Sequence, residues 1–202
     1  IQSLSFEEAL ILSERGAKVL HPKTIIPVMK YNIPLIVRNS KKVSDEGTKI
    51  YSDATTFSDG MAISWMNNLT LVSLIPTRGM NYFLITELLA GIFAKNKITP
   101  VLQLSSQNTI QFVLAEKKSL YAFVQDCTSI GKVEIFEKKA LLSLVGRNVF
   151  STNGIVSRIG KIIDSVPSYL FSTDKHSLSV SVVVDEANIS ILAQRIHKEF
   201  FE

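Results

Sequence analysis

The 202-residue sequence contains one cysteine, Cys127, and three histidines that lie far apart in the chain. A single cysteine excludes an internal disulfide framework and favours a reducing compartment. No apolar run approaches the roughly 20 residues that cross a bilayer, and no basic leader precedes an apolar core. We therefore expect a cytoplasmic protein with no membrane partner, in which Cys127 is a buried structural thiol.

Other classes of site are also missing. His21, His176 and His197 lack the spacing of metal ligands, so we expect no metal site. No glycine-rich loop is present to cradle a phosphate, which argues against a complete nucleotide-dependent enzyme. The net charge is +4, but no basic patch is interleaved with aromatic residues, which argues against nucleic acid as a partner. The 46% of hydrophobic residues is ordinary for a globular protein with buried cores.

The first fifty residues are predicted to form a compact segment. Ser5 is placed to cap a helix, Glu8 completes a capping box three residues later, and Gly16 is placed either to end the helix or to allow close packing. We interpret His21, next to a proline, as a structural hydrogen-bonding residue. The elements predicted after it are a helix at 24–30, a strand at 33–39 and a loop at 39–49.

A polar stretch at 51–60 is predicted to be a linker, and an alternation of strands and helices follows it. The first group has strands at 61–66, 69–75, 101–104, 109–114 and 132–136, with helices at 80–96 and 119–126. A turn is expected at Asn67-Asn68, and Thr77 is a candidate cap for the helix at 80–96. The second group has strands at 140–145, 169–172 and 178–184, with helices at 152–165 and 186–201.

The same order of strand, helix, strand, strand and helix occurs twice, about seventy residues apart. This order is typical of the ferredoxin-like βαββαβ arrangement. We therefore predict an α+β fold with modules at 61–136 and 137–202. The second module lacks a fourth strand, which would leave an unpaired sheet edge. The spare strand at 61–66 is predicted to pair into that second sheet.

Several motifs resemble the aspartate kinase family. Ser5-Phe6-Glu7-Glu8-Ala9, followed by Gly16-Ala17-Lys18-Val19-Leu20-His21-Pro22, is similar to the closing segment of the family's catalytic domain. Asn32-Ile33-Pro34-Leu35 and Gly47-Thr48 match the stretch after it. The paired modules look like the tandem ACT domains of this family. By this resemblance, residues 1–50 are an α/β remnant of an amino-acid kinase domain, and the modules are ACT domains.

The resemblance implies a parent enzyme that makes aspartyl phosphate from aspartate and ATP, with Mg²⁺, at the head of lysine, threonine and methionine synthesis. Lys18 matches a lysine near the nucleotide phosphates, where an ammonium neutralises phosphoryl charge; a solvated surface lysine is the alternative. The remaining catalytic segments are absent. We therefore expect this chain alone to be inactive and to bind no cofactor.

An amino-acid effector is expected in the first module. The turn Thr77-Arg78-Gly79-Met80 opens a helix, whose N-terminus favours a carboxylate, and Gly79 permits close approach. The family places the rest of its lysine or threonine site at positions matching Thr99, Val101, Ser105, Ser106, Gln107 and Asn108. Lysine-sensitive relatives carry acidic residues at the positions of Val101 and Gln107, so lysine, threonine or no effector remain open. A capped helix start without a ligand is the plainer alternative.

Two further expectations follow from the resemblance. A homodimer through edge strands of the first ACT domain would cover an exposed sheet edge. The parent is either monofunctional or fused to homoserine dehydrogenase. A free-standing tandem ACT protein that senses small molecules is the alternative function, and the segment from Gly16 to Pro22 favours the kinase.

Overall fold

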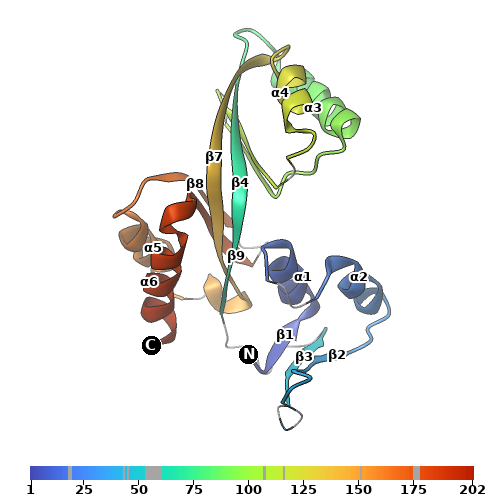
Figure 1. Cartoon of the computed structure of the whole chain (residues 1–202), viewed down its shortest axis with the longest axis vertical. Coiled ribbons are helices and arrows are strands. Elements are labelled where there is room, and N and C mark those ends of the chain that lie inside the picture. The colour runs from blue at the N-terminus through green and yellow to red at the C-terminus, as the bar shows by residue number, and fades with distance from the viewer. Residues whose placement is uncertain are drawn as a thin grey trace. The chain divides into compact units, whose positions relative to one another are not determined.

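The structure is a computed structural model that describes residues 1–17, 20–42, 44, 46–52, 61–106, 108–115, 117–150, 152–174 and 178–202. The fold is α+β, with helices and strands distributed over two compact units (Figure 1). One unit comprises residues 1–66 and 140–202, and the other comprises residues 67–139. Two long strands, β4 (Ala62–Pro76) and β7 (Gly131–Val145), run from one unit into the other.

A small α/β segment forms the start of the first unit. Its elements are β1 (Ser3–Ser5), α1 (Phe6–Glu14), α2 (Pro22–Lys30), β2 (Leu35–Val37) and β3 (Thr48–Tyr51). The strands are ordered β1-β3-β2, with β1 parallel and β2 antiparallel to β3. A cluster that includes Phe6, Ile25 and Ile50 fills the space between α1, α2 and the sheet.

The predicted capping box on α1 is confirmed. The Glu8 backbone N–H donates to Ser5 Oγ at 3.1 Å, and the Ser5 backbone N–H donates to Glu8 Oε2 at 2.8 Å. The helix ends at Glu14, Arg15 is its C-cap, and Gly16 follows with φ +97°. A Cβ at Gly16 would lie 2.5 Å from the Trp65 carbonyl oxygen, so glycine is required by contact as well as by conformation.

Several predicted boundaries in this segment are wrong. Helix α2 begins at Pro22 rather than at residue 24, because His21 caps it: His21 Nδ1 accepts a hydrogen bond from the Lys23 N–H at 3.1 Å. The structural role predicted for His21 is therefore confirmed. The predicted loop at 39–49 also ends earlier, since β3 starts at Thr48 and pairs with β1 and β2. Most of the predicted linker, residues 53–60, lies outside the described residues.

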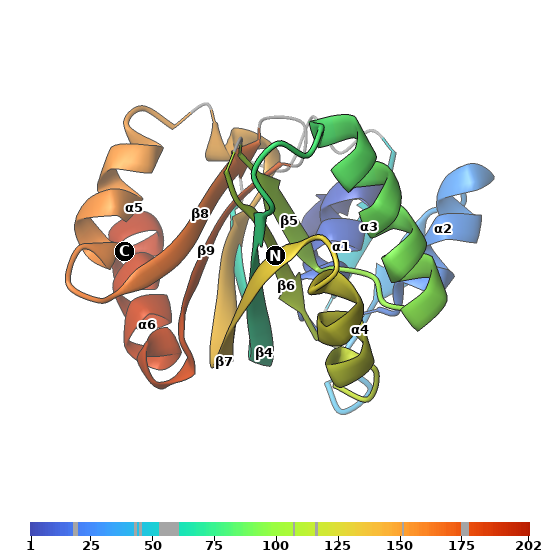
Figure 2. The same ribbon diagram turned by 90° about the horizontal axis from the view of Figure 1, so that it is seen from above.

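The unit formed by residues 67–139 contains α3 (Tyr82–Asn96), β5 (Leu102–Ser105), β6 (Ile110–Leu114) and α4 (Leu120–Cys127), together with parts of β4 and β7. Helices α3 and α4 lie side by side on one face of its strands (Figure 2). Three phenylalanines, Phe93, Phe112 and Phe123, centre its core, with ring centroids 5.0–6.1 Å apart. This aromatic packing joins both helices to the sheet.

The turn predicted at Asn67-Asn68 is wrong, because β4 continues through it without reversing direction. Asn68 has φ +60°, a conformation that asparagine tolerates, so the irregularity stays within the strand. Likewise, the strands predicted at 132–136 and 140–145 are one strand, β7, in which Lys138 has φ +53°. All six strands from β4 to β9 are hydrogen-bonded in the order β5-β6-β4-β7-β9-β8.

The C-terminal part of the first unit contains α5 (Ile155–Ile163), β8 (Ser168–Asp174), β9 (Ser179–Asp185) and α6 (Ile189–Phe201). Helices α5 and α6 cover one side of β8 and β9 (Figure 2). Ile155, Ile159 and Ile163 recur every four residues and bury one face of α5. The cluster beneath them also receives Met61 and Ile63 from the start of β4.

Candidate functional site

The predicted effector turn, Thr77–Met80, joins β4 to α3. The Thr77 N–H donates to the Ile130 carbonyl at 2.9 Å, and the Met80 N–H donates to the Thr77 carbonyl at 3.2 Å. Gly79 has φ +86°, and no atom lies within 4 Å of the position that its Cβ would occupy. The turn is thus anchored at Thr77, closed at Met80, and open to solvent at its centre.

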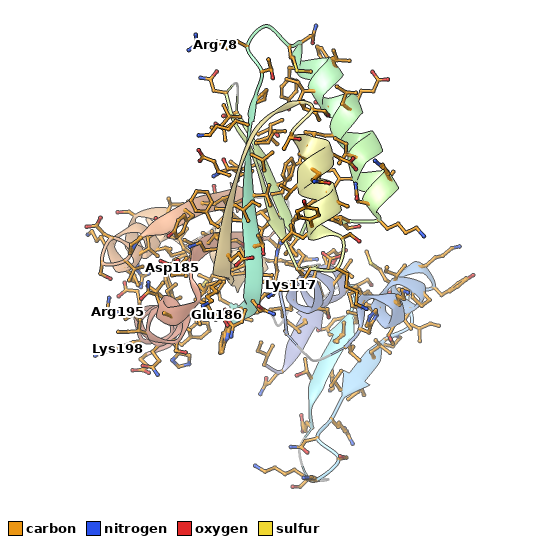
Figure 3. The ribbon with its side chains drawn as sticks, turned by 45° about the horizontal axis from the view of Figure 1, so that its top comes forward. Arg78, Lys117, Asp185, Glu186, Arg195 and Lys198 are labelled. Carbon is orange, nitrogen blue, oxygen red and sulfur yellow. The ribbon has the colours of Figure 1, made fainter. Side chains whose placement is uncertain are left out.

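Two backbone amides of the turn are available to a ligand. Within the part of the chain that the structure describes, the Arg78 and Gly79 N–H groups donate to no other protein group. The Arg78 side chain extends from the free end of the turn (Figure 3), and its guanidinium is permanently charged. Free amide donors beside a cation form an arrangement that suits a carboxylate.

The sequence predicted that Thr77 caps the following helix, and this prediction is wrong. Asn81 caps it instead: Asn81 Oδ1 accepts a hydrogen bond from the Phe83 N–H at 2.8 Å. The left-handed backbone of Gly79 delays the helix, which starts at Tyr82. The Phe83 N–H at the start of α3 is therefore already hydrogen-bonded. The amides that remain available to a ligand include those of Arg78 and Gly79 in the preceding turn.

A cavity of about 420 Å³ lies against this turn. Its lining combines the four turn residues with one polar residue from another turn and three apolar residues: Thr77, Arg78, Gly79, Met80, Asn108, Ile75, Pro76 and Ile85. Pairing explains the arrival of Asn108, because Ile110 of β6 is opposite both Leu74 of β4 and Ser105 of β5. A small ligand with a carboxylate and an aliphatic portion matches this lining.

The other predicted effector residues do not line this cavity. Ser105 ends β5, and Ser106 closes the following turn through hydrogen bonds with Thr109. Thr99 and Val101 lie at the opposite end of β5, where the Val101 N–H donates to the Val113 carbonyl at 2.8 Å. Gln107 lies outside the described residues. The structure therefore brings together Thr77, Arg78, Gly79, Met80 and Asn108 from the predicted set.

Sequence reasoning missed the apolar part of the lining. Ile75 and Pro76 precede the turn on β4, and Ile85 is a buried residue of α3. Each lies close in sequence to a predicted site residue, so its part in the lining could have been predicted from its position beside the turn. Ile85 follows the turn by one helical turn and belongs to the apolar face that packs on the sheet.

Lys18, predicted to lie beside nucleotide phosphates, is outside the described residues. The nearest described residues used here are Ala17 before it and His21 after it. Ala17 packs against the Phe6 cluster, its N–H donating to the Leu12 carbonyl at 2.9 Å, and His21 caps α2. In the sequence, Lys18 falls between α1 and α2.

A second hollow, of about 550 Å³, occurs in the unit formed by residues 1–66 and 140–202. Its lining is mostly apolar and includes Trp65, Met61 and Phe201, with Ser190, Gln194 and His197 as the polar side chains. None of these carries a fixed charge that would hold both the carboxylate and the ammonium of an amino acid. The turn cavity is therefore the better candidate.

The remaining chemistry-bearing groups do not suggest a reactive centre. Cys127 is fully buried, and burial, with a smaller contribution from Asp126, raises the pKa of its thiol to about 12. This confirms the predicted structural thiol. Among the described residues, no group of three or more His, Cys, Asp or Glu side chains is arranged to hold a metal ion. No described helix has the length and hydropathy needed to cross a membrane.

Comparison with known proteins finds bifunctional aspartokinases among the relatives of this chain. No protein-family model matches the chain. The bifunctional aspartokinase/homoserine dehydrogenase of Buchnera aphidicola is 27% identical over the whole chain, and the maize chloroplastic enzyme 1 of that name is 30% identical over 77% of it. The chain spans only 26% and 19% of these two relatives. Both relatives are kinases fused to a dehydrogenase, and neither is a free-standing sensor.

Solved structures agree on the fold. Escherichia coli aspartokinase III, crystallised with aspartate and ADP, matches 100% of the chain with a TM-score of 0.89 at 22% identity, over 47% of its own length. The same enzyme crystallised with lysine and aspartate matches with a TM-score of 0.79. The chain is therefore a relative of the aspartokinases over its whole length, and it aligns with their C-terminal part.

Proposed function

We propose that this chain is the amino-acid-sensing regulatory region of an aspartate kinase, joined to the end of the kinase domain. The cavity at Thr77–Met80 carries this proposal. It offers two unpaired backbone amides, a cationic side chain and an apolar wall on the fold of a regulated kinase. The parent enzyme would transfer the ATP γ-phosphoryl group to the side-chain carboxylate of L-aspartate.

The effector is proposed to be lysine or threonine. Its carboxylate would accept hydrogen bonds from the Arg78 and Gly79 amides, and its aliphatic portion would face Ile85. Asn108 would supply a carbonyl oxygen to the ammonium group. A related enzyme was crystallised with lysine, which supports the class of ligand. Among the described residues that line the cavity, none is acidic, so no carboxylate there would hold a lysine side chain, which favours the smaller threonine.

Two ACT modules are proposed to build this region. Residues 67–139 have the order strand, helix, strand, strand, helix, strand, from β4 to β7. The second module reuses β7 and continues with α5, β8, β9 and α6. We propose that residues 61–66 complete its sheet, because Met61 and Ile63 pack against its core. An ACT module is a common fold for binding small amino acids, consistent with the cavity at Thr77–Met80.

Residues 1–50 are proposed to be the end of the kinase domain. Their sheet has strands of three or four residues, which are too short to be stable alone. Large apolar side chains are left exposed on one stretch: Ile26, Met29, Tyr31, Ile33 and Ile36. A preceding part of the kinase would cover such a patch. Lys18 would then serve the phosphates of Mg²⁺-ATP, and the chain without that part is expected to be inactive.

A homodimer through the first ACT module is also proposed. Strand β5 is at the edge of the sheet order, and its Leu104 is 37% exposed. The outer face of α3 presents Phe83, Leu84 and Leu88, of which Phe83 is 80% exposed. An exposed apolar helix face and an open strand edge are surfaces that pairing with a second copy would bury.

Calorimetric titration of the chain with L-lysine, L-threonine and L-methionine tests the effector site. We expect heat of binding with lysine or threonine, and a loss of about tenfold in affinity for Asn108→Ala, which removes one charge-assisted hydrogen bond. Asn96→Ala is the matched control, because its amide contacts Asp126 and Ile92 and does not line the cavity. Absence of heat with all three amino acids would contradict the proposal.

A further inference from the structure

The connection from β7 to α5, residues 146–154, corresponds to the connection from β4 to α3. Each follows a long strand and precedes the first helix of the repeated order. Each also contains a left-handed glycine before the helix, Gly79 with φ +86° and Gly154 with φ +67°. The second connection starts with Gly146, whose N–H donates to the Leu178 carbonyl, and a 3₁₀ turn at Arg147–Val149. The two turns therefore occupy equivalent positions.

The second turn already holds a carboxylate. Glu8 Oε1 accepts a hydrogen bond from the Arg147 backbone N–H at 2.9 Å, although 139 positions separate the two residues. Its other oxygen, Oε2, accepts from the Ser5 N–H at 2.8 Å. The Glu8 side chain is only 1% exposed. Both oxygens are thus engaged by backbone amides in a site closed to water.

We propose that the Glu8 carboxylate is a built-in ligand of the second turn, in the place where the carboxylate of an amino-acid effector binds at the first. The Arg147 amide is the counterpart of the open amides at Arg78 and Gly79. The C-terminal module is therefore occupied by the chain's own α1 and does not respond to free amino acids there. The inference rests on the proposed function in one respect, that the first turn is a carboxylate site.

The surroundings of Glu8 support a fitted site. Val145, the last residue of β7, belongs to the same buried cluster as Phe6 and Ala9 of α1. Apolar packing between α1 and the end of β7 therefore accompanies the hydrogen bond from Arg147 to Glu8. The Arg147 side chain pairs with the exposed Glu7, with Nη2 and Oε2 3.7 Å apart. Recognition of Glu8 therefore uses the backbone of the turn, as expected for a carboxylate-binding turn.

The consequence is a fixed joint between α1 and the C-terminal module. Residues 1–17 are held to this module by the carboxylate at one end and by the close contact of Gly16 with Trp65 at the other. A change in the position of the second turn would move α1, which leads into Lys18. The Glu8–Arg147 hydrogen bond thus couples the position of the C-terminal module to that of α1, which precedes the segment proposed to serve the kinase.

Chemical rescue tests the proposal directly. Glu8→Ala removes a CH₂–COO⁻ group, which is the size of acetate. We expect the Tm of this variant to fall by about 5–10 °C, because two hydrogen bonds to a charged acceptor are lost. Sodium acetate should restore about half of that loss in a saturable manner, because a ligand that binds only the folded state raises Tm. Sodium chloride at equal ionic strength should not.

Glu7→Ala is the matched control. Its carboxylate is exposed and its ion pair with Arg147 is long, so we expect a small change in Tm and no response to acetate beyond that to chloride. The same Tm for Glu8→Ala in acetate and in chloride would overturn the inference. So would an equal acetate response in Glu7→Ala, since that response would be unspecific.

A second variant covers the case in which Glu8→Ala does not fold. Glu8→Gln keeps the shape of the side chain but removes the charge and one acceptor. In a ¹⁵N–¹H spectrum, we expect the Arg147 amide to shift and its hydrogen exchange to accelerate about tenfold, with no such change in Glu7→Gln. An unchanged Arg147 amide in Glu8→Gln would overturn the inference. Neither readout involves a free effector, so failure of the calorimetric titration would count against the first turn as a carboxylate site and not against the binding of Glu8 by the second turn.

Discussion

The turn after β4 and the turn after β7 hold equivalent places in the two units, yet one is open and the other is filled. At Thr77–Met80, two backbone amides lie against a cavity and have no hydrogen-bond acceptor among the described residues. At Gly146–Arg147, the acceptor is Glu8, from the first helix of the chain. Under the proposed function, a repeated fold keeps one copy responsive and makes the other structural by supplying the ligand from its own chain.

The cores beneath the two turns also differ. Residues 67–139 are centred on the Phe93, Phe112 and Phe123 rings. The fully buried residues of the C-terminal cluster are aliphatic, and a hydrogen bond of 2.8 Å between the Ser143 and Ser181 hydroxyls lies buried nearby. The two units are therefore expected to unfold as separate cooperative bodies, each sensitive to its own core.

The largest expected effect comes from breaking one core and sparing the other. Phe112→Ala should destabilise residues 67–139 by about 3–5 kcal/mol, because it empties the centre of the aromatic cluster. Thiol labelling of Cys127 under increasing urea reports on this unit, since the buried, protonated thiol reacts only after unfolding. Leu142→Ala, in the other core, is the control and should leave Cys127 protection nearly unchanged. Equal loss of protection in both variants would mean that the units unfold together.

A second prediction concerns the anchor of the open turn. A Cβ at Gly131 would lie 2.2 Å from the Ile75 carbonyl oxygen, so Gly131→Ala must push β4 and β7 apart beside the cavity. We expect a loss of about 1–3 kcal/mol in unfolding free energy and weaker effector binding by calorimetry. Gly160→Ala is a suitable control, because open space surrounds its Cβ position. Unchanged stability of Gly131→Ala would show that this contact relaxes freely.

A third prediction compares the two left-handed glycines. Gly79 and Gly154 have positive φ and no atom near the Cβ position. Alanine at either should therefore destabilise by about 1 kcal/mol through backbone strain alone. Only Gly79→Ala should also weaken effector binding, because only that turn faces the cavity. Equal affinity for the effector in both variants would remove Gly79 from the site.

The smallest effect is expected at the surface of α3. Hydrogen bonds from Lys95 and Asn96 hold the pKa of the Asp126 carboxyl below its ordinary value. A carboxyl with a lowered pKa stabilises the folded state above its unfolded pKa, and that stabilisation is lost as pH falls through the folded pKa. The Tm of wild type should therefore exceed that of Asp126→Asn at neutral pH, and the gap should close below the ordinary aspartate pKa of about 3.9. A gap that persists in acid would assign the effect to packing.

Local sequence signals predicted a large part of this fold. The Ser5–Glu8 capping box and the four-residue recurrence of Ile155, Ile159 and Ile163 are short-range patterns, and each forms as expected. The failures at Asn67-Asn68 and at residues 137–139 share one cause. Polar residues within a strand resemble a turn when only the sequence is read, whereas pairing with neighbouring strands carries the chain straight on.

The candidate site was predictable only in part. Thr77–Met80 combine a helix start with a glycine, which is a local signal, and Asn108 follows from the strand pairing. Asn81 was not identified as the cap, because the delay imposed by Gly79 depends on its actual φ. No signal in the sequence links Glu8 to Arg147. Their contact depends on the complete topology, and a capping box already accounts for Glu8 locally.

Residues 67–139 are inserted in the sequence between the two parts of the other unit, and this order has a consequence for folding during synthesis. Residues 67–139 are contiguous, so all of their partners have been made once residue 139 leaves the ribosome. The enclosing unit needs residues 1–66 and 140–202 together, and Glu8 meets its amide only after β7 is complete. Because domains fold as their sequence emerges, we expect residues 67–139 to fold first, and α1 to meet Arg147 only after β7 has been synthesised.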